Sequence, residues 1–320
     1  MSSRLDELRA AGTVVITDTA DFQKIAAFRP SEGTTNPSLI FTAAQNASYE
    51  PLLTKTISYV RSLPEETCRD EQLSRAVEML SVQFGKEIYK LTGRISTEVD
   101  VSLSFDTAGT VAAALRILEL YAAEGIPKDK VRIKISATWE GIQATRILQK
   151  EYGASCLVTI VFGSVQAIAA AEAGADAIAP YVGRIADYGK QHGHQGDLGI
   201  EVVSAIQNYL RKYNHSTQVM AASFRNVDQI RALASIDLLT AAPSILELIE
   251  ADNRPVVPVL TVESAQAAEL QQVSYINDES KFRWAFNADA LAVEKSAEAM
   301  RKFGDDTEKL KSLLSKLLNV

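Results

Sequence analysis

One lysine stands inside a short apolar segment whose alternation predicts a β-strand. Lys134 lies between Ile133 and Ile135 in the segment 131–136, so in a strand the two isoleucines point to one side and the lysine to the other. Lysine is rarely buried without a purpose, and an apolar interior is expected to lower its pKa. A neutral amine is the nucleophile that forms a Schiff base with a ketone. The alternative is a buried lysine that a carboxylate neutralises and that has no chemistry of its own; the pattern leaves both open.

Two carboxylates stand at or near the ends of other predicted strands. Asp18 ends the segment 14–18, and Glu98 lies near the end of the segment 94–99. Taken singly, a carboxylate at such a position is often a helix cap or an ion-pair partner. Together with an inward-pointing lysine, however, the two supply one nucleophile and two groups for proton transfer.

Further polar side chains fall within or just after predicted strands. Arg184, Ser223 and Arg225 combine two forked guanidinium donors with a hydroxyl, which suits a phosphate group. The loops after late strands commonly hold phosphate in α/β barrels, although any one of the three could be an ordinary surface residue. The other polar candidates are Thr34, Asn36 and Thr159.

Composition argues against several classes of protein. The chain has 320 residues with 33 Lys and Arg against 40 Asp and Glu, and it has no basic block, which argues against nucleic-acid binding. Its two distant cysteines predict neither a disulfide framework nor a zinc site and fit the reducing cytoplasm.

The most apolar stretch, 156–182, is interrupted by polar residues, so it predicts strand and helix rather than a membrane span, and the N-terminus has no apolar signal segment. His192 and His194 have no third ligand nearby in the sequence, so no metal site is expected.

Short β-branched segments alternate with helical patterns along most of the chain, which implies parallel strands joined by right-handed crossovers. An open doubly wound sheet usually carries a glycine-rich turn after its first strand, whereas Asp18-Thr19-Ala20-Asp21 follows here. We therefore predict an α/β fold of the TIM (β/α)8 barrel type. Its eight strands are expected at 14–18, 34–35, 94–99, 131–136, 157–162, 177–181, 218–222 and 237–240.

The pattern changes after about residue 255, and helices are expected at 262–273, 288–303 and 307–318. We predict a single α/β barrel domain over residues 1–320, with 260–320 as C-terminal helices packed on the barrel. Packing against the barrel is the simpler interpretation of a leucine stripe in the last helix, and binding of a partner is the alternative. This stripe consists of Leu310, Leu313, Leu314, Leu317 and Leu318.

Seven short motifs occur in an order that is specific to one enzyme family. They are the segments 18–22 (DTADF), 34–39 (TTNPSL), 96–100 (STEVD), 134–141 (KISATWEG), 182–185 (VGRI), 222–226 (ASFRN) and 282–287 (FRWAFN). On these motifs, which span nearly the whole chain, the protein resembles the transaldolase family, the Schiff-base enzymes of the non-oxidative pentose phosphate pathway. The resemblance implies an α/β barrel with additional helices, in agreement with the fold expected from the periodicity.

The resemblance also implies roles for the candidate residues. Lys134 is the expected Schiff-base lysine, and Asp18 is the expected acid/base at the hydroxyl where the carbon–carbon bond breaks. Glu98 is expected to exchange protons with a catalytic water, assisted by Thr159. The implied substrate-binding residues are Thr34, Asn36, Arg184, Ser223 and Arg225, the last three for a phosphate.

The activity that the resemblance implies is transfer of a three-carbon ketol unit from a phosphorylated ketose to an aldose. Sugar phosphates are therefore the expected partners, and no metal or organic cofactor is needed, because the iminium is the electron sink. A cytoplasmic location and a homodimer are further expectations, and no nucleic-acid or membrane partner is expected.

Several residues depart from the usual family pattern, among them Leu157, Ala179 and Tyr181. Leu157 and Ala179 stand where the family usually has Asn and Ser, whose side chains hydrogen-bond the hydroxyls of a dihydroxyacetone unit. Losing such a partner costs about 1–3 kcal/mol per group, so a less hydroxylated donor, such as a hydroxyacetone-like ketone, is one alternative. Tyr181 replaces the usual Phe and matches the related fructose-6-phosphate aldolases, which favours aldolase-type release, although its ring could simply pack as Phe does. A non-catalytic paralogue with a binding or regulatory role is a third hypothesis, against which the intact catalytic candidates argue.

Overall fold

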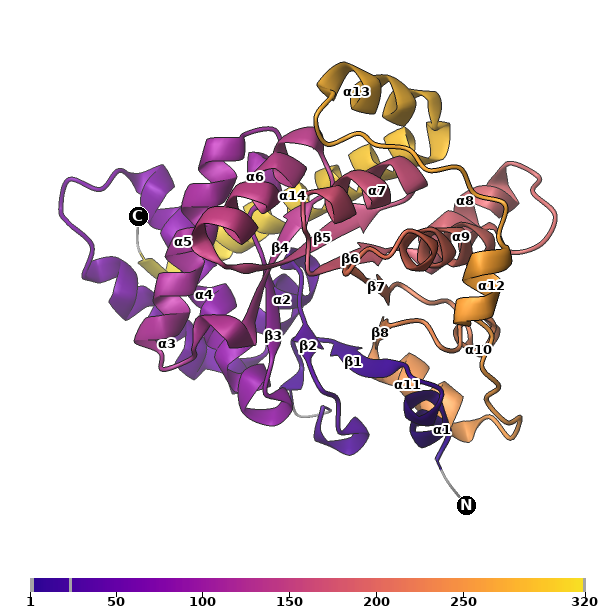
Figure 1. The fold of residues 1–320 in the computed structure, drawn as a ribbon. Helices are drawn as coiled ribbons and strands as arrows, with labels where there is room; N and C mark the ends of the chain where they lie inside the picture. The colour runs from indigo at the N-terminus through magenta and orange to yellow at the C-terminus, as the bar shows by residue number, and fades with distance from the viewer. Residues whose placement is uncertain (1–2, 23–24, 319–320) are drawn as a thin grey trace.

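The computed structural model describes residues 3–22 and 25–318. Within these residues, eight parallel strands pair in sequence order, and the first pairs with the last to close a barrel. Helices pack around the outside of the strands (Figure 1), so the predicted TIM-barrel fold is confirmed. The strands are β1 (Val14–Asp18), β2 (Gly33–Thr34), β3 (Ile95–Glu98), β4 (Val131–Ser136), β5 (Ser155–Val161), β6 (Ala177–Pro180), β7 (Gln218–Ala221) and β8 (Leu238–Ala241). Their ends differ from the predicted ones by at most two residues.

Several helices begin where a short polar side chain can cap them. Asn36 caps α2 by accepting a hydrogen bond from Leu39 N at 3.0 Å, and Pro37 takes the first helical position. The helices are α1 (Arg4–Ala10), α2 (Pro37–Ala44), α3 (Glu50–Arg61), α4 (Arg69–Thr92), α5 (Thr107–Ala123), α6 (Trp139–Tyr152), α7 (Ser164–Glu172), α8 (Val182–Gln191), α9 (Leu198–Lys212), α10 (Val227–Ala232), α11 (Pro243–Ala251), α12 (Val262–Ala267), α13 (Glu279–Ala288) and α14 (Ala290–Leu318).

Strand β4 shows how the barrel wall separates its side chains. All of its residues are buried, and Ile133 and Ile135 belong to an apolar cluster with residues of α4, α5 and α6 on the outer side. Lys134, between them, lines a cavity at the barrel mouth, so the predicted alternation is confirmed. Arg132, nearer the start of the strand, is also buried and forms an ion pair with Asp176 at 2.7 Å.

The C-terminal region differs from the prediction in two ways. Helix α12 ends at Ala267 instead of continuing to 273, because side chains of α9 take the next backbone carbonyls: the Tyr209 hydroxyl donates to Val273 O at 3.0 Å. The helices predicted at 288–303 and 307–318 are one continuous helix, α14. Gly304 lies inside it, and a single glycine costs a helix only about 1 kcal/mol, which is too little to end one that is packed against its neighbours.

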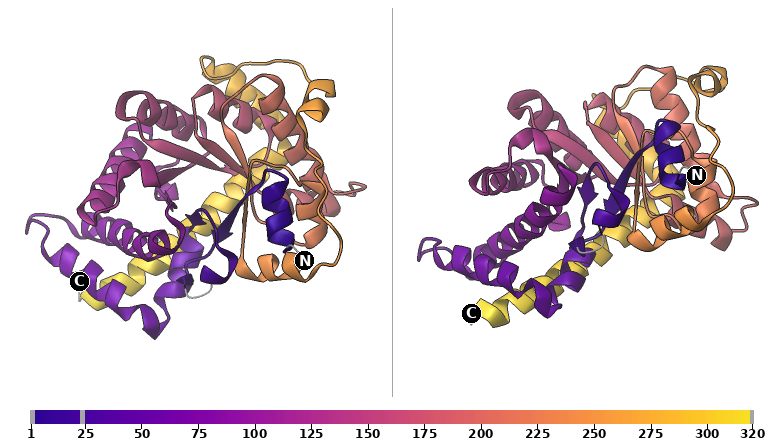
Figure 2. Two further views of the ribbon diagram at one scale, coloured as in Figure 1. Left: turned by 60° about the horizontal axis from the view of Figure 1, so that its bottom comes forward. Right: turned by 90° about the horizontal axis from the view of Figure 1, so that it is seen from below.

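Helix α14 crosses the molecule from α13 to the layer formed by α2, α3 and α4 (Figure 2). On the way it contacts β5 and α8. Leu310, Leu314 and Leu318 are buried in an apolar cluster with residues of α2, α3 and α4. Most of the leucine stripe therefore packs inside the chain, while Leu317 is 42% exposed.

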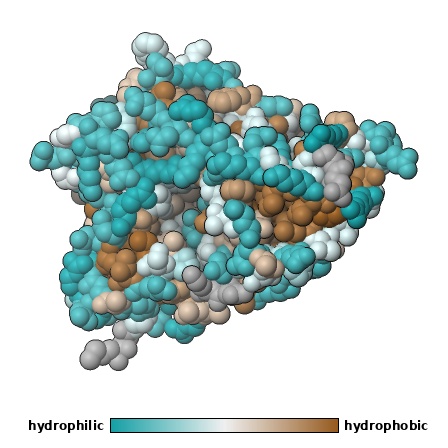
Figure 3. Space-filling view, turned by 180° about the vertical axis from the view of Figure 1, so that it is seen from behind, coloured by the Kyte–Doolittle hydropathy of each residue, from teal (hydrophilic) through white to brown (hydrophobic). Residues whose placement is uncertain are grey.

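The molecular surface is mostly hydrophilic on the face that Figure 3 shows, with separate apolar areas between hydrophilic ones. Exposed large apolar side chains include Phe105, Val262 and Trp284. Within residues 3–22 and 25–318, no helix is both long enough and apolar enough to cross a membrane.

Candidate active site

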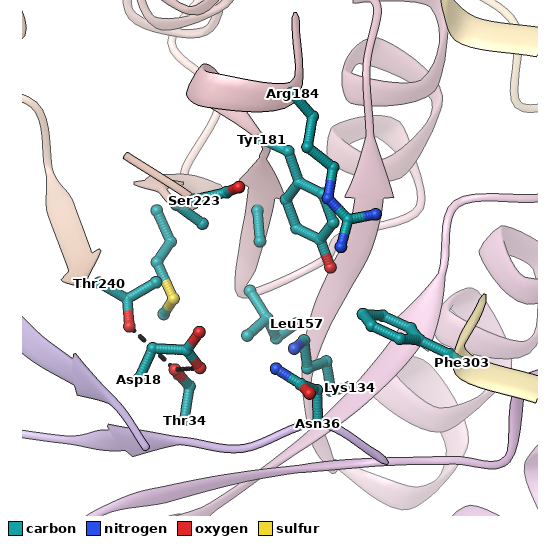
Figure 4. A pocket seen from close by; sticks show the side chains of 13 residues that line it. Asp18, Thr34, Asn36, Lys134, Leu157, Tyr181, Arg184, Ser223, Thr240 and Phe303 are labelled. Carbon is teal, nitrogen blue, oxygen red and sulfur yellow. Dashed lines mark hydrogen bonds between the residues drawn. The ribbon is translucent and has the colours of Figure 1, made fainter. Parts of the chain in front are cut away.

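A cavity of about 80 Å³ lies at the carboxyl ends of the strands (Figure 4), the face on which α/β barrels carry their chemistry. Nine predicted residues line it: Asp18, Thr34, Asn36, Lys134, Leu157, Ala179, Tyr181, Arg184 and Ser223. Four further residues line it as well: Met220, Ala222, Thr240 and Phe303. Glu98, Thr159 and Arg225 do not line the cavity, but each contacts a residue that does.

Lys134 is almost fully buried, and its amine has two close oxygen neighbours. Nζ lies 3.2 Å from Glu98 Oε2 and donates a hydrogen bond to Thr35 O at 3.1 Å. Burial alone acts to lower the pKa of Lys134, but the neighbouring Glu98, Tyr181 and Asp18 raise it by more, so the net shift is upward. The expectation of a lowered pKa is therefore wrong for this structure, because the sequence did not show how close the carboxylates lie.

Glu98 has a buried side chain, only 2% exposed, behind Lys134. Burial raises the pKa of its carboxyl group against the opposing effect of Lys134. Neither carboxyl oxygen has a hydrogen bond of good geometry among the described residues, so both keep acceptor capacity toward a nearby proton. These properties suit a group that takes up and returns a proton.

Asp18 lies on another side of the cavity and is oriented by two threonines. Thr34 Oγ1 donates to Asp18 Oδ1 at 2.8 Å and lies 2.9 Å from Thr240 Oγ1. A hydroxyl carries one proton, so when Thr34 donates to Asp18, the hydrogen atom in the second contact comes from Thr240. Burial raises the pKa of Asp18, while Lys134 and the hydrogen bond from Thr34 act to lower it.

Tyr181 brings Thr159 into contact with the site. The two hydroxyls lie 2.9 Å apart, and Thr159 is fully buried behind the cavity wall. In the register of β4 and β5, Thr159 pairs with Ser136. The next residue, Ile160, has a φ of 61°, which is uncommon for a β-branched residue and coincides with a register shift between β5 and β6.

One wall of the cavity is apolar. It consists of Leu157, Ala179, Met220 and Ala222, all of them buried. Leu157 pairs with Lys134 in the register of β4 and β5, and Figure 4 shows its side chain beside the lysine amine. None of these side chains carries a good hydrogen-bonding group for a substrate hydroxyl.

Another part of the cavity lining is cationic. The Arg184 guanidinium lies 5.2 Å from the ring centroid of Tyr181 and 5.7 Å from that of Phe303, and no ion pair within the described residues involves it. Ser223 has a φ of 63°, a conformation that costs a non-glycine residue about 1–3 kcal/mol. Arg225 lies outside the cavity, with Nη1 3.4 Å from Ser223 Oγ.

The sequence matches one protein family over most of its length. The family model for transaldolase/fructose-6-phosphate aldolase matches residues 15–314, and transaldolase from Fusarium oxysporum f. sp. lycopersici is 45% identical, over 99% of this chain and 100% of that protein. The chain belongs to the transaldolase/fructose-6-phosphate aldolase family. Transaldolases from Saccharomyces cerevisiae and Homo sapiens are each 44% identical over 98% of this chain, and the matches cover 95% and 94% of those proteins. This member of the family is therefore an enzyme of the transaldolase class, a transferase.

Sequence reasoning missed four lining residues of this transaldolase-class enzyme. Thr240 ends a predicted strand, so the search for polar residues at strand ends could have found it. Met220 and Ala222 are apolar, and that search does not select apolar residues. Phe303 belongs to α14, which reaches the barrel mouth from the far end of the sequence, and no strand pattern indicates that contact.

Two other features considered in the sequence lie away from the cavity. His192 stacks on the ring of Tyr188 at 3.9 Å, and His194 Nε2 lies 3.0 Å from Glu201 Oε1. Among the residues that the structure describes, no group of three or more histidine, cysteine or carboxylate side chains is placed to hold a metal ion. Both cysteines are free.

Proposed function

We propose that this transaldolase-class enzyme moves a three-carbon ketol unit from a phosphorylated ketose to an aldose phosphate through a Schiff base on Lys134. The observation that carries the proposal is the position of Lys134 Nζ, 3.2 Å from Glu98 Oε2, in a cavity that Asp18 also lines. One buried site thus combines a nucleophile with two carboxyl groups for proton transfer.

Formation of the Schiff base begins with a proton transfer. Because neighbouring groups raise the pKa of Lys134, its resting form is the ammonium ion, which must lose a proton before it attacks. Glu98, whose pKa is raised by burial, accepts this proton. The neutral amine adds to the ketone carbonyl, and Glu98 returns its proton to the former carbonyl oxygen. A second proton passes from the attached nitrogen to the same oxygen, which then leaves as water and gives the iminium.

Cleavage follows from the position of Asp18. Its carboxylate takes the proton of the hydroxyl on the carbon beyond the bond that breaks, and the bonding electrons move into the iminium, which becomes an enamine. An aldehyde leaves, and the three-carbon enamine stays on Lys134. A second aldehyde accepts the enamine carbon, Asp18 returns its proton to the new hydroxyl, and water releases the product from Lys134.

The phosphate of the substrate binds on the cationic side of the cavity. Arg184 and Ser223 line this side, and Arg225 stands beside Ser223. Two guanidinium groups and a hydroxyl supply the donors that phosphate oxygens need. Phosphate bound there places the sugar chain between the arginine side and Lys134.

Borohydride trapping with fructose 6-phosphate tests the proposal. We expect reduction to attach the substrate carbon to Lys134, detected by peptide mass spectrometry, and addition of erythrose 4-phosphate to give transfer. The Lys134→Met variant should not be labelled there, whereas Lys86→Met, which removes a lysine of the outer surface, should be labelled like the wild type. If no candidate ketone labels Lys134, the Schiff-base proposal is wrong and the non-catalytic alternative gains support.

A second candidate is an aldolase-type reaction on a less hydroxylated donor. The apolar wall favours it, because Leu157 and Ala179 line the same cavity as Lys134 and cannot bind a donor hydroxyl. The Tyr181 hydroxyl, held 2.9 Å from Thr159 Oγ1, supports release of the intermediate without an acceptor aldehyde.

Changing the wall distinguishes the two candidates. Leu157→Asn combined with Ala179→Ser should raise kcat/KM for a dihydroxyacetone-type donor relative to hydroxyacetone by about tenfold or more, since each restored hydrogen bond contributes about 1 kcal/mol. No gain from the double variant would count against a role for this wall in donor choice. Release of glyceraldehyde 3-phosphate from fructose 6-phosphate alone, without an acceptor, would favour the aldolase.

Other expectations from the sequence stay predictions. They are a cytoplasmic location, a place in the pentose phosphate pathway, a homodimer, and no nucleic-acid or membrane partner. Light scattering on the purified enzyme tests the homodimer directly.

A further inference from the structure

Arg225 is held from one side by a carboxylate that has no part in the chemistry proposed above. Its Nε and Nη2 donate to Asp187 Oδ2 at 3.0 and 2.9 Å. Its remaining nitrogen, Nη1, lies 3.4 Å from Ser223 Oγ, on the side of the cavity. Asp187 therefore occupies the edge of the guanidinium that faces away from Ser223 and leaves the other edge directed at the cavity side.

The stem of Arg225 lies against the first turn of α8, where a glycine makes room for it. A Cβ atom on Gly183 would come within 2.7 Å of Arg225 Cγ and 2.3 Å of Ser223 O. Gly183 N also donates to Ser223 O at 3.0 Å. Residues four apart share one face of a helix. Gly183 and Asp187 therefore form one continuous surface of α8 against which Arg225 packs, and Arg184 lies between them in the sequence.

The backbone of Arg225 is fixed by other contacts. Arg225 N donates to Gln229 Oε1 at 2.8 Å, and Gln229 Nε2 donates to Asp197 Oδ2 at 2.9 Å. Removing the Asp187 carboxylate therefore frees the guanidinium and leaves the main chain in place. The Asp187 and Arg225 side chains are 37% and 44% exposed, and ion pairs at such exposure contribute little to folding stability.

We propose that Asp187 is a positioning residue that pre-orients Arg225 for an anionic group of the substrate. The inference rests on the proposed phosphate-binding role of Arg184, Ser223 and Arg225. Without Asp187, the long arginine side chain must be ordered when the anion binds, and that cost weakens binding. The opposing possibility is that Asp187 competes with the anion for Arg225, in which case its removal strengthens binding.

Binding of inorganic phosphate to the full-length enzyme, measured by isothermal titration calorimetry, separates these outcomes without any turnover. Asp187→Ala should raise the Kd for phosphate about threefold to tenfold, the effect of ordering one flexible side chain. Asp187→Asn keeps a side-chain oxygen as acceptor without the charge and should stay close to the wild type. An unchanged or lower Kd in Asp187→Ala, or no phosphate binding by the wild type, would overturn the proposal.

Steady-state kinetics give a second readout that a merely structural role would not move. With fructose 6-phosphate, Asp187→Ala should raise KM about threefold to tenfold at unchanged kcat, whereas KM for unphosphorylated fructose should not change. An equal rise in both KM values would contradict the positioning role. Glu279→Ala is a matched control, because it removes the carboxylate of an ion pair of similar exposure, with Arg283 on α13, and should leave both KM values unchanged. If the wild type processes no ketose, the proposed reaction fails, while the phosphate titration still decides the role of Asp187.

Discussion

Replacing Lys134 by methionine separates its role in folding from its role in catalysis. Its amine lies 3.2 Å from Glu98 Oε2, and the two side chains are only 6% and 2% exposed. Methionine fills a similar volume and carries no charge. The Lys134→Met variant therefore keeps most of the packing and leaves the carboxyl groups of Glu98 and Asp18 without their neighbouring cation.

The expected loss of stability follows from this burial and depends on pH. Removing one partner of a buried ion pair costs about 3–5 kcal/mol when the other stays charged, and we expect a loss of this size at pH 8. Burial already raises the pKa values of Glu98 and Asp18, and loss of the ammonium ion raises both further. A group whose folded pKa exceeds its unfolded value stabilises the fold when protonated, and this contribution is lost as the pH rises through the folded pKa. The difference in unfolding free energy between the variant and the wild type should thus be small near pH 4–5 and grow toward pH 8.

Urea unfolding followed by circular dichroism at pH 5 and pH 8 measures the effect. Adding Glu98→Gln to the Lys134→Met variant removes a buried charge. The double variant should recover at least about 1 kcal/mol of unfolding free energy at pH 8. Lys90→Met is the control, because Lys90 is 54% exposed beside its partner Glu87 and the loss of folding free energy there should stay below about 1 kcal/mol at both pH values. The reasoning would be refuted if the loss of unfolding free energy in Lys134→Met did not grow with pH. It would also be refuted if adding Glu98→Gln recovered none of that free energy.

Three further changes test single contacts of the site and of α14. Thr240→Val removes the hydroxyl that orients Thr34, and kcat for transfer should fall about tenfold at similar KM, in line with one lost hydrogen bond; an unchanged kcat would show that Thr34 is oriented without it. Phe303→Ala removes a ring 5.7 Å from the Arg184 guanidinium and should raise KM for a phosphorylated donor about threefold to tenfold, as expected for a cation–π contact; a rise in KM for unphosphorylated fructose as well would contradict this cause. Gly304→Ala adds a methyl group whose nearest neighbour lies at 3.9 Å and should raise the free energy of unfolding by about 0.5–1 kcal/mol. A lower free energy of unfolding, measured with urea, would mean that the helix needs the glycine.

Local sequence patterns were sufficient to predict the barrel but not the path of its last helix. Alternation acts within a few positions along the chain, so it predicted all eight strands of the described chain. The length of α14 depends on packing against α2 and α4, elements far away in the sequence. That packing outweighs the local cost of Gly304, so the two predicted helices form one.

In the site too, features set by neighbouring residues were predicted, whereas features set by contacts between distant segments were not. Strand alternation predicted that Lys134 points inward, and the cavity confirms it. The direction of its pKa shift was predicted wrongly, because it depends on Glu98 and Asp18 from β3 and β1, whose distances to the amine arise only when the barrel closes. Phe303 was missed for a similar reason, since it enters the cavity from a helix at the other end of the chain.

The apolar cluster formed by α2, α3, α4 and α14 has a consequence for how the protein is made. Ile40, Leu80 and Phe84 leave the ribosome long before Leu310 and Leu314, which complete their cluster. The first helices therefore expose apolar surface until α14 has been made, and contacts between such distant segments form slowly. Nascent chains that stop short of α14 should be the species that chaperones bind and proteases degrade, although the strand that carries Lys134 has already been made.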